Sequence, residues 1–375
     1  MNSAKPKRRA ASFALVAGAV LLSLAVLEIG CRLLTLGPAS LLHWTNLARL
    51  EMRMSESDSE SEARAACNFS WDAELGWSLV PNCHSPGWDT DANGNRMVPL
   101  PPDKAGTVLA KPPILATGSS FTFGMEVADG ETWPAYLQAL SGRVVVNAGM
   151  SGFSLDQTVL QTERMAAKLK PLVIVASFTP GDLGRNELKV AYSREKPYFA
   201  LTSDGLELKN VPVPKRSRPP LPAAARWLGW SELAHEVVER LGIRDGWYYE
   251  EERASPTGIG EEISCRLIPR LVHLGVPVLV VAQFGRNYWG GDTAWQASQY
   301  AVSAKMLSCA AKAGLATLDL SGPLKPLIEA KGLNALYGRD NHTPAGNKVV
   351  ADLILQELLR RHLLNQSAAE KKQMR

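Results

Sequence analysis

Two short segments of this 375-residue chain carry side chains that can act together in acyl transfer. Gly-Ser-Ser-Phe-Thr-Phe occupies residues 118–123, and Asp-Asn-His occupies residues 340–342. A serine hydroxyl, an imidazole and a carboxylate are the groups that make and break a covalent ester, as nucleophile, general base and orienting acid. The sequence therefore predicts Ser120 as the nucleophile, His342 as the base and Asp340 as the acid.

The periodicity around these segments predicts the elements that must bring them together. Short apolar runs cover residues 113–117, 144–146, 172–177, 276–281 and 316–320, and segments with helical spacing cover residues 133–140, 157–169, 261–274, 296–313 and 345–363. This alternation is typical of a parallel sheet covered by helices on both faces. We expect an α/β protein: a flavodoxin-like three-layer α/β/α sandwich with a parallel five-stranded sheet, preceded by one transmembrane helix.

In a sheet of this kind the reacting groups gather where the strands end. Ser120 follows the first apolar run, although a Gly-Ser turn that caps a helix is a common alternative use of serine. His342 follows an aspartate and precedes a Pro-Ala-Gly helix start. Packing in linker, cap or amphipathic-helix contexts explains the other histidines: His43, His84, His235, His273 and His362. We therefore expect His342 to be the base.

Four blocks, in this order, resemble the GDSL or SGNH hydrolase superfamily, particularly its bacterial membrane-anchored members. Gly-Ser-Ser-Phe-Thr-Phe-Gly at residues 118–124 looks like the first family block, Gly-Asp-Ser-Phe-Thr-Phe-Gly. Asn-Ala-Gly-Met-Ser-Gly at residues 147–152 looks like the second block, and residues 178–182 fall at the third. Asp-Asn-His-Thr-Pro-Ala-Gly at residues 340–346 falls at the last block. The resemblance covers roughly residues 71–363.

The resemblance implies how the site would work. His342 would take the proton of Ser120 as its oxygen attacks an ester carbonyl, and Asp340 would steady the imidazolium. The N–H groups of Ser120 and Gly149 would hold the oxyanion. The resemblance implies no metal and no organic cofactor.

The sequence departs from the family pattern at three positions of the expected site. Ser119 stands where an aspartate normally precedes the nucleophile, and Gly181 stands where an asparagine normally precedes an aspartate. Arg339 occupies the place where the acid commonly stands, three residues before the histidine. Asn186, five residues after Gly181, is a candidate replacement for the missing oxyanion donor.

The amino terminus is typical of a membrane anchor. Its first cations are Lys5, Lys7, Arg8 and Arg9, and an uncharged run from Ala10 to Leu27 follows. Such a run can cross a bilayer, and positive charge stays on the cytoplasmic side. One alternative is a cleaved secretory peptide, for which Pro38 is unfavourable at the cleavage site. The other is a lipoprotein signal ending at Cys31, for which Glu28 is unfavourable three residues before the cysteine. We expect a single-pass anchor in the inner (cytoplasmic) membrane, with the remainder periplasmic.

Net charge and cysteine content indicate which partners and which compartment to expect. The net charge is +4, which equals the charge of the four cations before the anchor, so no basic nucleic-acid surface is expected. Beyond the anchor four cysteines remain, and we expect Cys67 to pair with Cys83 and Cys265 with Cys309 in an oxidising compartment. The alternative is four buried thiols. No C-x-x-C or His-Cys spacing favours a metal site.

Composition divides the chain into successive regions. We expect a cytoplasmic tail and anchor at residues 1–36, a linker at 37–66, a small β-rich cap at 67–110, a hydrolase-like domain at 111–364 with an insert at about 188–256, and a flexible tail at 365–375. The linker is acidic and rich in serine, a composition that stays solvated. Within the insert, residues 223–241 have the spacing of a helix.

The sequence thus predicts a serine-dependent hydrolase of ester bonds on an acylated small molecule or a cell-envelope glycan. Tyr288 and Trp289 follow the fourth apolar run, and their rings can stack on sugar faces or pack beneath the insert. One alternative is a polysaccharide O-acyltransferase, in which a sugar hydroxyl replaces water. Another is a catalytically weakened glycan-binding or scaffold protein, which the departures at Ser119 and Gly181 favour.

Overall fold

The computed structural model describes residues 4–42, 67, 69–85, 87–100, 112–215, 223–243, 247 and 251–364. The chain forms two compact units. The first consists of residues 1–64 and 218–250, and the second of residues 65–217 and 251–375. The candidate chemistry lies in the second unit.

The second unit contains the predicted sheet. Its strands are β5 (Ile114–Thr117), β6 (Val145–Asn147), β7 (Val173–Phe178), β13 (Val278–Ala282) and β14 (Ala316–Asp319). They lie in the order β6-β5-β7-β13-β14, and every pairing is parallel, with Leu115 opposite Ile174 and Val280 opposite Ala176. This order places β5, the first strand of the sheet in sequence, between the second and the third, β6 and β7, as in flavodoxin-like sheets. The predicted five-stranded parallel sheet is confirmed.

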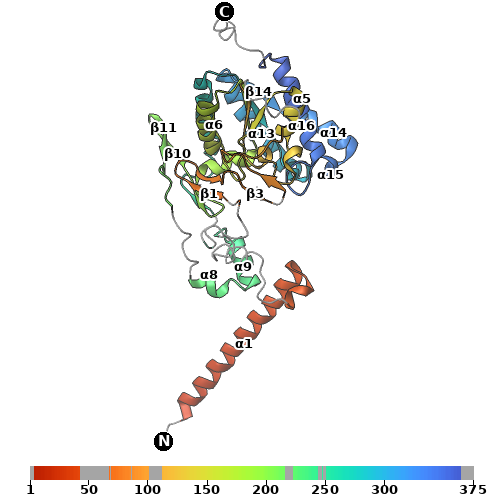
Figure 1. Cartoon of the computed structure of the whole chain (residues 1–375). Helices are drawn as coiled ribbons and strands as arrows, with labels where there is room; N and C mark the ends of the chain where they lie inside the picture. Colours follow the sequence, from red (N-terminus) through yellow and green to blue (C-terminus); the bar gives the residue numbers. More distant parts are fainter. Residues whose placement is uncertain are drawn as a thin grey trace, which may run out of the picture. The chain divides into compact units, whose positions relative to one another are not determined.

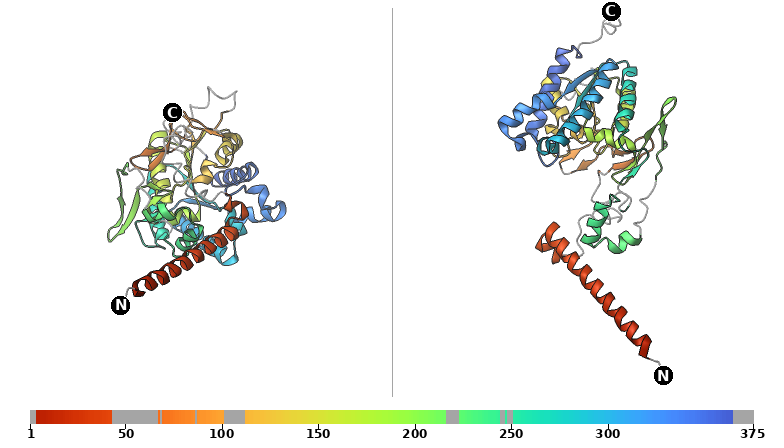
Figure 2. Two further views of the ribbon diagram at one scale, coloured as in Figure 1. Left: turned by 90° about the horizontal axis from the view of Figure 1, so that it is seen from below. Right: turned by 180° about the vertical axis from the view of Figure 1, so that it is seen from behind.

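Helices cover both faces of this sheet (Figures 1 and 2). One face packs against α6 (Leu155–Leu169), α11 (Gly260–Leu267) and α13 (Thr293–Lys312). The other face packs against α5 (Trp133–Ser141), α14 (Ser321–Lys331) and α16 (Pro344–Arg360). Because successive residues of a strand point to opposite faces, Leu115 joins the first cluster and Ile114 the second. The result is the expected three-layer arrangement.

A smaller strand-rich layer packs against the beginning of the site. Its strands are β1 (Phe69–Asp72), β2 (Gly76–Leu79), β3 (His84–Ser85) and β4 (Trp88–Asp89), joined as two antiparallel pairs. The ring of Trp88 lies edge-on to Phe123 with centroids 5.2 Å apart, and Trp77 lies edge-on to Phe153 at 5.5 Å. These contacts support the loops that leave the sheet near Ser120.

The inserted region differs from its sequence-based description. Strands β8 (Leu188–Ala191), β9 (Arg194–Glu195), β10 (Tyr198–Thr202), β11 (Gly205–Lys209) and β12 (Glu252–Arg253) occupy its second-unit part, and β10 and β11 form a hairpin (Figure 1). The single helix expected over residues 223–241 is instead two, α8 (Ala223–Leu228) and α9 (Glu232–Arg240). The break occurs because Ser231 caps α9, its hydroxyl accepting a hydrogen bond from Ala234 N at 3.0 Å.

The first unit contains a long amino-terminal helix. Helix α1 runs uninterrupted over Ala4–Thr35 (Figures 1 and 2), and the short 3₁₀ helix η1 (Pro38–Leu41) follows it. Within α1, the 24 residues Ser12–Thr35 reach a hydropathy of 2.3 and are long and apolar enough to cross a membrane. The apolar helix therefore extends about two turns beyond the predicted end of the run at Leu27.

Both predicted cysteine pairs form disulfides in the second unit. Cys67 and Cys83 have Cα atoms 5.4 Å apart, and Cys265 and Cys309 have Cα atoms 5.3 Å apart. The second disulfide links α11 to α13, two helices that cover the same face of the sheet. Cys31, in α1, forms no disulfide.

Candidate active site

Ser120 stands just beyond the carboxyl end of strand β5. Gly118 makes the turn with a φ of 151°, where a Cβ atom would lie only 2.4 Å from Thr122 Oγ1 and 2.5 Å from Ser177 Oγ. Only glycine fits this position without displacing those side chains. Ser120 then opens the one-turn helix α4 (Ser120–Phe123). In the part of the chain that the structure describes, its N–H group has no hydrogen-bond acceptor.

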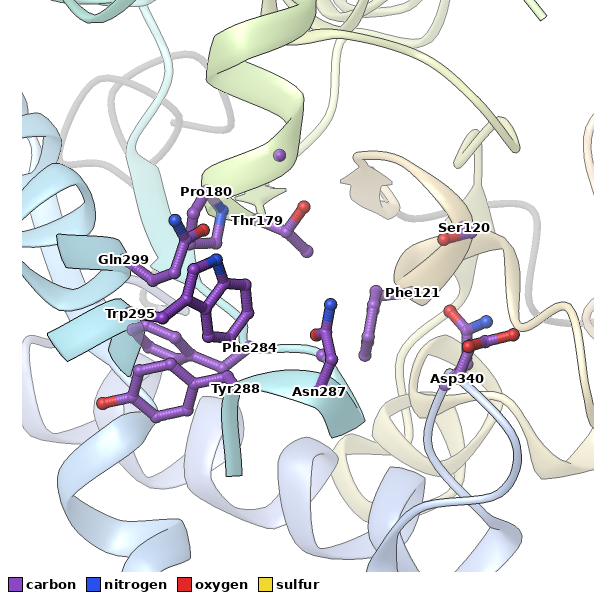
Figure 3. Close-up of a pocket in the computed structure, with 13 residues that line it drawn as sticks. Ser120, Phe121, Thr179, Pro180, Phe284, Asn287, Tyr288, Trp295, Gln299 and Asp340 are labelled. Atoms are coloured by element: carbon purple, nitrogen blue, oxygen red, sulfur yellow. The ribbon is translucent and has the colours of Figure 1, made fainter. Parts of the chain in front are cut away.

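A pocket of about 300 Å³ opens beside Ser120 (Figure 3). Ser120 and Asp340 lie at one side, and the rings of Phe284, Tyr288 and Trp295 gather at the other. The remaining lining residues are Phe121, Thr179, Pro180, Gly181, Gly285, Asn287, Gln299 and Asn341. The pocket thus has a polar end that carries the candidate nucleophile and an aromatic end.

His342 is buried next to this pocket, in the loop before α16. Only 2% of the residue is exposed to solvent. The imidazole packs edge-on to the ring of Phe121, with centroids 5.1 Å apart, and against the ring of Tyr337, with centroids 4.5 Å apart. Burial lowers the pKa of the imidazole to about 4, a shift that the Leu336 backbone partly opposes. The ring is therefore neutral at pH 7, which is the protonation state of a general base.

The structure brings His342 to the residue that follows Ser120, but no hydrogen bond joins the two. Among the described residues, neither ring nitrogen of His342 has a hydrogen-bond partner. Catalytic hydrogen bonds often form only when substrate is bound. His342 thus contacts Phe121, the neighbour of Ser120, and the predicted hydrogen bond between base and nucleophile is not made.

The carboxylate of Asp340 is bonded to Arg339 and not to His342, its predicted partner. Its carboxylate accepts a hydrogen bond from Arg339 Nε at 3.1 Å, and 67% of the side chain is exposed. The carboxylate lies in the pocket wall, on the side of the pocket where Figure 3 shows Ser120. No hydrogen bond between Asp340 and His342 is found in the described part of the chain.

Glu126 and Arg286 hold the loop that carries His342, and neither was predicted from the sequence. The Glu126 carboxylate accepts hydrogen bonds from the backbone N–H groups of Arg339, Asp340 and Asn341 at 2.8, 2.9 and 3.0 Å. Although burial raises the pKa of Glu126, these hydrogen bonds lower it below its usual value. Glu126 is more than 200 residues away from the loop in sequence, so no local motif signals this contact.

Arg286 holds the same loop through its carbonyl groups. Its Nη1 donates to the carbonyl oxygens of Tyr337 and Gly338 at 3.1 and 2.9 Å, and its backbone N–H donates to the carbonyl of Asp340 at 3.3 Å. Arg286 opens the short helix α12 (Arg286–Gly290), directly after the strand β13 and its following turn. The loop before His342 is therefore fixed at both its N–H and its C=O groups.

Ser119, which precedes the candidate nucleophile, is bonded to a buried carboxylate. The Ser119 hydroxyl donates to Oδ2 of buried Asp182 at 2.8 Å, and the same oxygen accepts the backbone N–H of Thr179 at 2.8 Å. Asp182 also pairs with Arg185, whose Nη2 donates to the Phe153 carbonyl at 2.8 Å. The turn before Ser120 is thus tied by a hydroxyl to a carboxylate that follows β7.

Two of the predicted oxyanion donors, Gly149 and Asn186, already have hydrogen-bond partners within the protein. The N–H of Gly149 donates to Asn147 Oδ1 at 3.0 Å, and a Cβ atom at Gly149 would lie 2.5 Å from Phe123 N, so this loop packs tightly on α4. Asn186 is fully buried; its Oδ1 accepts Asp156 N–H at 3.0 Å and its Nδ2 donates to Ser264 Oγ at 2.8 Å. Asn186 does not line the pocket, and both ends of its amide are bonded within the core.

Of the two aromatic residues predicted for the substrate site, only Tyr288 lines the pocket. Tyr288 lines the pocket, whereas Trp289 packs behind it, with its ring 4.9 Å from Tyr288 and 6.4 Å from Tyr337 between centroids. Trp295 and Phe284 line the aromatic end but were not predicted. Trp295 lies there because Asp292 caps α13 by accepting the Trp295 N–H at 2.8 Å.

No family model and no curated protein matches this chain in sequence. Solved structures resemble it at low identity. LAE5, an alpha/beta hydrolase enzyme from the metagenome of Lake Arreo, is 14% identical with a TM-score of 0.41, covering 68% of this chain and 97% of its own. The esterase EstA from Pseudoalteromonas sp. is 11% identical with a TM-score of 0.38, covering 68% and 100%.

A third similar structure is a lipolytic protein of the G-D-S-L family from Desulfitobacterium hafniense DCB-2. It is 13% identical with a TM-score of 0.33, covering 66% of this chain and all of its own. At these identities and scores the similarity carries no information on activity. The function must be inferred from the geometry of the pocket.

Proposed function

We propose that the second unit is a serine-dependent hydrolase of ester bonds, with Ser120 as nucleophile and His342 as general base. The observation that carries this proposal is the position of Ser120, at the carboxyl end of β5 and in the wall of a pocket next to which a neutral, buried imidazole lies. Glu126 and Arg286 support the proposal because they fix the backbone that presents this imidazole.

In the proposed reaction, Ser120 Oγ attacks the ester carbonyl carbon as His342 takes the hydroxyl proton. The backbone N–H of Ser120, which has no acceptor among the described residues, holds the oxyanion. Gly149 contributes a second N–H if its bond to Asn147 Oδ1 exchanges for the oxyanion. The protonated imidazole then returns the proton to the leaving alkoxide, and water repeats the sequence on the acyl-enzyme.

We assign Asp340 as the carboxylate that stabilises the imidazolium. It lies two residues before His342 in the pocket wall, and its partner Arg339 is exposed. An exposed ion pair contributes at most about 1 kcal/mol, so the carboxylate can exchange this partner at little cost. Asn186 takes no part in the proposal, because both ends of its amide are bonded in the core.

The aromatic end of the pocket supports a substrate with a flat apolar face, such as an acylated glycan. Tyr288 and Trp295 are the rings that would stack on a sugar, and the acyl group would reach Ser120. Replacement of Trp295 by alanine should raise KM for an acetylated oligosaccharide about tenfold and leave turnover of a small acetyl ester unchanged. Equal effects on both substrates would contradict this assignment.

A covalent probe distinguishes an enzyme from a binding or scaffold protein. We expect a fluorophosphonate to label the detergent-solubilised full chain, and the Ser120→Ala variant to lose both labelling and hydrolysis of p-nitrophenyl acetate. Ser203→Ala, in the exposed turn between β10 and β11, is the matched control and should behave as the unchanged chain. Labelling that survives in Ser120→Ala, or a chain that is never labelled, would remove Ser120 as the nucleophile.

The absence of a Ser120–His342 hydrogen bond and the glycine at position 181 favour the weakened binding protein as the second candidate. A polysaccharide O-acyltransferase is the third, with the same nucleophile and a sugar hydroxyl in place of water. Product analysis separates hydrolysis from transfer. Release of free acetate from an acetylated glycan supports the hydrolase, and acetate found on an added glycan acceptor supports the transferase.

We further propose that the chain is a single-pass protein of the inner membrane with this unit on the periplasmic side. The length and composition of α1, the cations that precede its apolar run and the two disulfides support this orientation. Protease added to spheroplasts should then degrade the second unit. Protection of the whole chain until the membrane is lysed would contradict the orientation.

A further inference from the structure

The anchor helix α1 carries a buried ion pair near its carboxyl end. Glu28 and Arg32 lie one turn apart, and Arg32 Nε donates to Glu28 Oε1 at 2.6 Å. Their exposed fractions are 5% and 0%, whereas most apolar side chains of the same helix are exposed, among them Leu21, Leu27 and Leu34. One face of the helix end is therefore covered by protein.

The protein that covers this face of α1 is the beginning of α9, about 200 residues later in the chain. Glu28 caps this helix, because its carboxylate accepts the Ser231 hydroxyl at 2.7 Å and the backbone N–H groups of Glu232 and Leu233 at 2.9 and 3.0 Å. A carboxylate at a helix amino terminus is favourable both for the hydrogen bonds and for the helix dipole. The first turn of α9 is thus fastened to the end of the apolar helix.

Arg32 completes the attachment. Its guanidinium donates to the carbonyl oxygens of Trp230 and Ser40, and the hydroxyl of Thr35 donates to Glu232 Oε1 at 2.9 Å. A buried ion pair is tolerated only where further hydrogen bonds satisfy both groups. Here the segment around α9 supplies the partners of the carboxylate, and the guanidinium donates both to that segment, at Trp230, and to Ser40 in η1.

The position of Glu28 sets the depth of this attachment in a bilayer. The uncharged run from Ala10 to Leu27 rises about 27 Å as a helix. The hydrocarbon core of a bilayer is about 30 Å thick. Glu28 therefore falls at the outer boundary of the hydrocarbon, and the start of α9 lies at the level of the lipid headgroups.

Around this attachment the first unit exposes large apolar side chains. Trp227 is 78% exposed and Leu241 is 65% exposed, and Val237, Leu34 and Leu42 are exposed as well. Tryptophan is enriched at membrane–water interfaces, where its ring is at the depth of the headgroups. The charged side chains of α9 are mainly acidic, Glu232, Glu236 and Glu239 against Arg240, so attraction to anionic lipid is not the cause of binding.

We infer that α8 and α9 form a lipid-binding surface that lies in the outer headgroup layer, with Trp227 and Leu241 inserted. The occupant is lipid because the surface is continuous with a helix suited to span the membrane and is joined to it by Glu28 and Arg32. Insertion depends on apolar area, so zwitterionic lipid is sufficient. The inference requires the transmembrane position proposed for α1.

Depth-dependent fluorescence quenching tests the inference on the full chain in phosphatidylcholine vesicles. In a Cys31→Ala background, the variants Trp227→Cys, Leu21→Cys and Ser203→Cys are each labelled with NBD. Spin-labelled lipids carry the quencher either at the headgroup or in the middle of the acyl chain. Ser203, in the exposed turn of the second unit, is the matched control.

We expect position 227 to be quenched at least threefold more by the headgroup quencher than by the acyl-chain quencher, position 21 to show the reverse, and position 203 to be quenched by neither. Quenching at 21 but not at 227 would overturn the inference and leave the anchor intact. No quenching at 21 would overturn the transmembrane position itself. Contact between copies would appear as energy transfer between labels at 227 without lipid quenching, and would also overturn it.

A second variant tests the attachment. Replacing both Glu28 and Arg32 with leucine removes the ion pair without leaving an unpaired charge in the helix. Quenching at position 21 should persist, and headgroup quenching at position 227 should fall by at least half. Unchanged quenching at position 227 would show that Glu28 and Arg32 do not hold this surface at the membrane.

Discussion

The hydroxyl of Ser119 donates a 2.8 Å hydrogen bond to Oδ2 of Asp182, across 63 residues of sequence. Both side chains are buried, and Asp182 also accepts the Thr179 N–H and pairs with Arg185. The carboxylate that supports the turn before Ser120 therefore comes from the short helix α7 (Pro180–Gly184), which follows β7, and not from position 119. A serine at this position is matched to its surroundings.

We expect the substitution Ser119→Asp to destabilise the protein. It would place two carboxylates side by side in a buried site, where one must take up a proton or move. The unfolding free energy should fall by about 2 kcal/mol or more, against about 1 kcal/mol for Ser119→Ala, which only removes a donor. Thermal unfolding midpoints measure both. A Ser119→Asp variant that unfolds at a higher temperature than Ser119→Ala would contradict this expectation.

Glu126→Gln should lower kcat about tenfold with little change in KM, because Glu126 positions the His342 loop without touching the pocket. An amide has one acceptor oxygen in place of two, so it loses the bond from Arg339 or those from Asp340 and Asn341, and it accepts the remainder more weakly than a carboxylate. Glu131→Gln is the matched control, since that carboxylate also accepts a backbone N–H, from Ala128, in the neighbouring turn. Equal kinetics for the two variants would contradict the positioning role.

Gly181→Asn should raise kcat/KM by about tenfold to a hundredfold, because it adds a side-chain donor to the pocket wall that holds Ser120. A Cβ atom at Gly181 would meet only Arg185 Nη1 at 3.5 Å and Thr179 Oγ1 at 3.9 Å, which are ordinary contacts. Gly181→Ala occupies the same space without a donor and should leave the rate unchanged. Identical rates for the two variants would show that no oxyanion lies within reach of position 181.

His342 should make stability depend on pH between about 6.5 and 4. Its pKa is lowered from 6.5 to about 4 by burial, so the unfolded chain binds the proton first as the pH falls. The stabilisation from the neutral ring is complete above pH 6.5 and falls by about 3 kcal/mol on reaching pH 4. Thermal unfolding across this range should therefore show a steeper loss for the unchanged chain than for His342→Gln. Parallel curves would mean that the ring is accessible to protons in the folded state.

The two disulfides should contribute unequally to stability. Cys265 and Cys309 close a loop of sequence separation 44, and Cys67 and Cys83 one of separation 16, so their removal should cost about 4 and about 3 kcal/mol respectively. The measurement is the unfolding midpoint of each double cysteine-to-serine variant under oxidising conditions. Reductant should lower the midpoint of the unchanged chain below both. A chain insensitive to reductant would contradict the assignment of these bonds to stability.

The agreement between sequence and structure is closest in the sheet. The run at residues 113–117 corresponds to β5, Ile114–Thr117, and the segment at 133–140 to α5, Trp133–Ser141. Buried parallel strands are continuously apolar, and the helices that cover them repeat with helical spacing, so both are visible locally. The insert was less predictable because its strands are short and antiparallel, and because a single cap at Ser231 divides α8 from α9.

Local patterns in the sequence were enough to place Ser120 at a strand end, to identify the apolar helix and to predict the cysteine pairs. The first two depend on periodicity and composition, and the third on the order of four cysteines along the chain, joined without crossing. The partners of the site residues depended on folding across long separations: Ser119 with Asp182, Glu126 with the loop before His342, and Glu28 with Ser231. The same packing placed His342 against Phe121 and gave Asp340 an exposed partner. Such contacts are set by the direction of each side chain after the elements have packed, and residue spacing along the chain does not encode that direction.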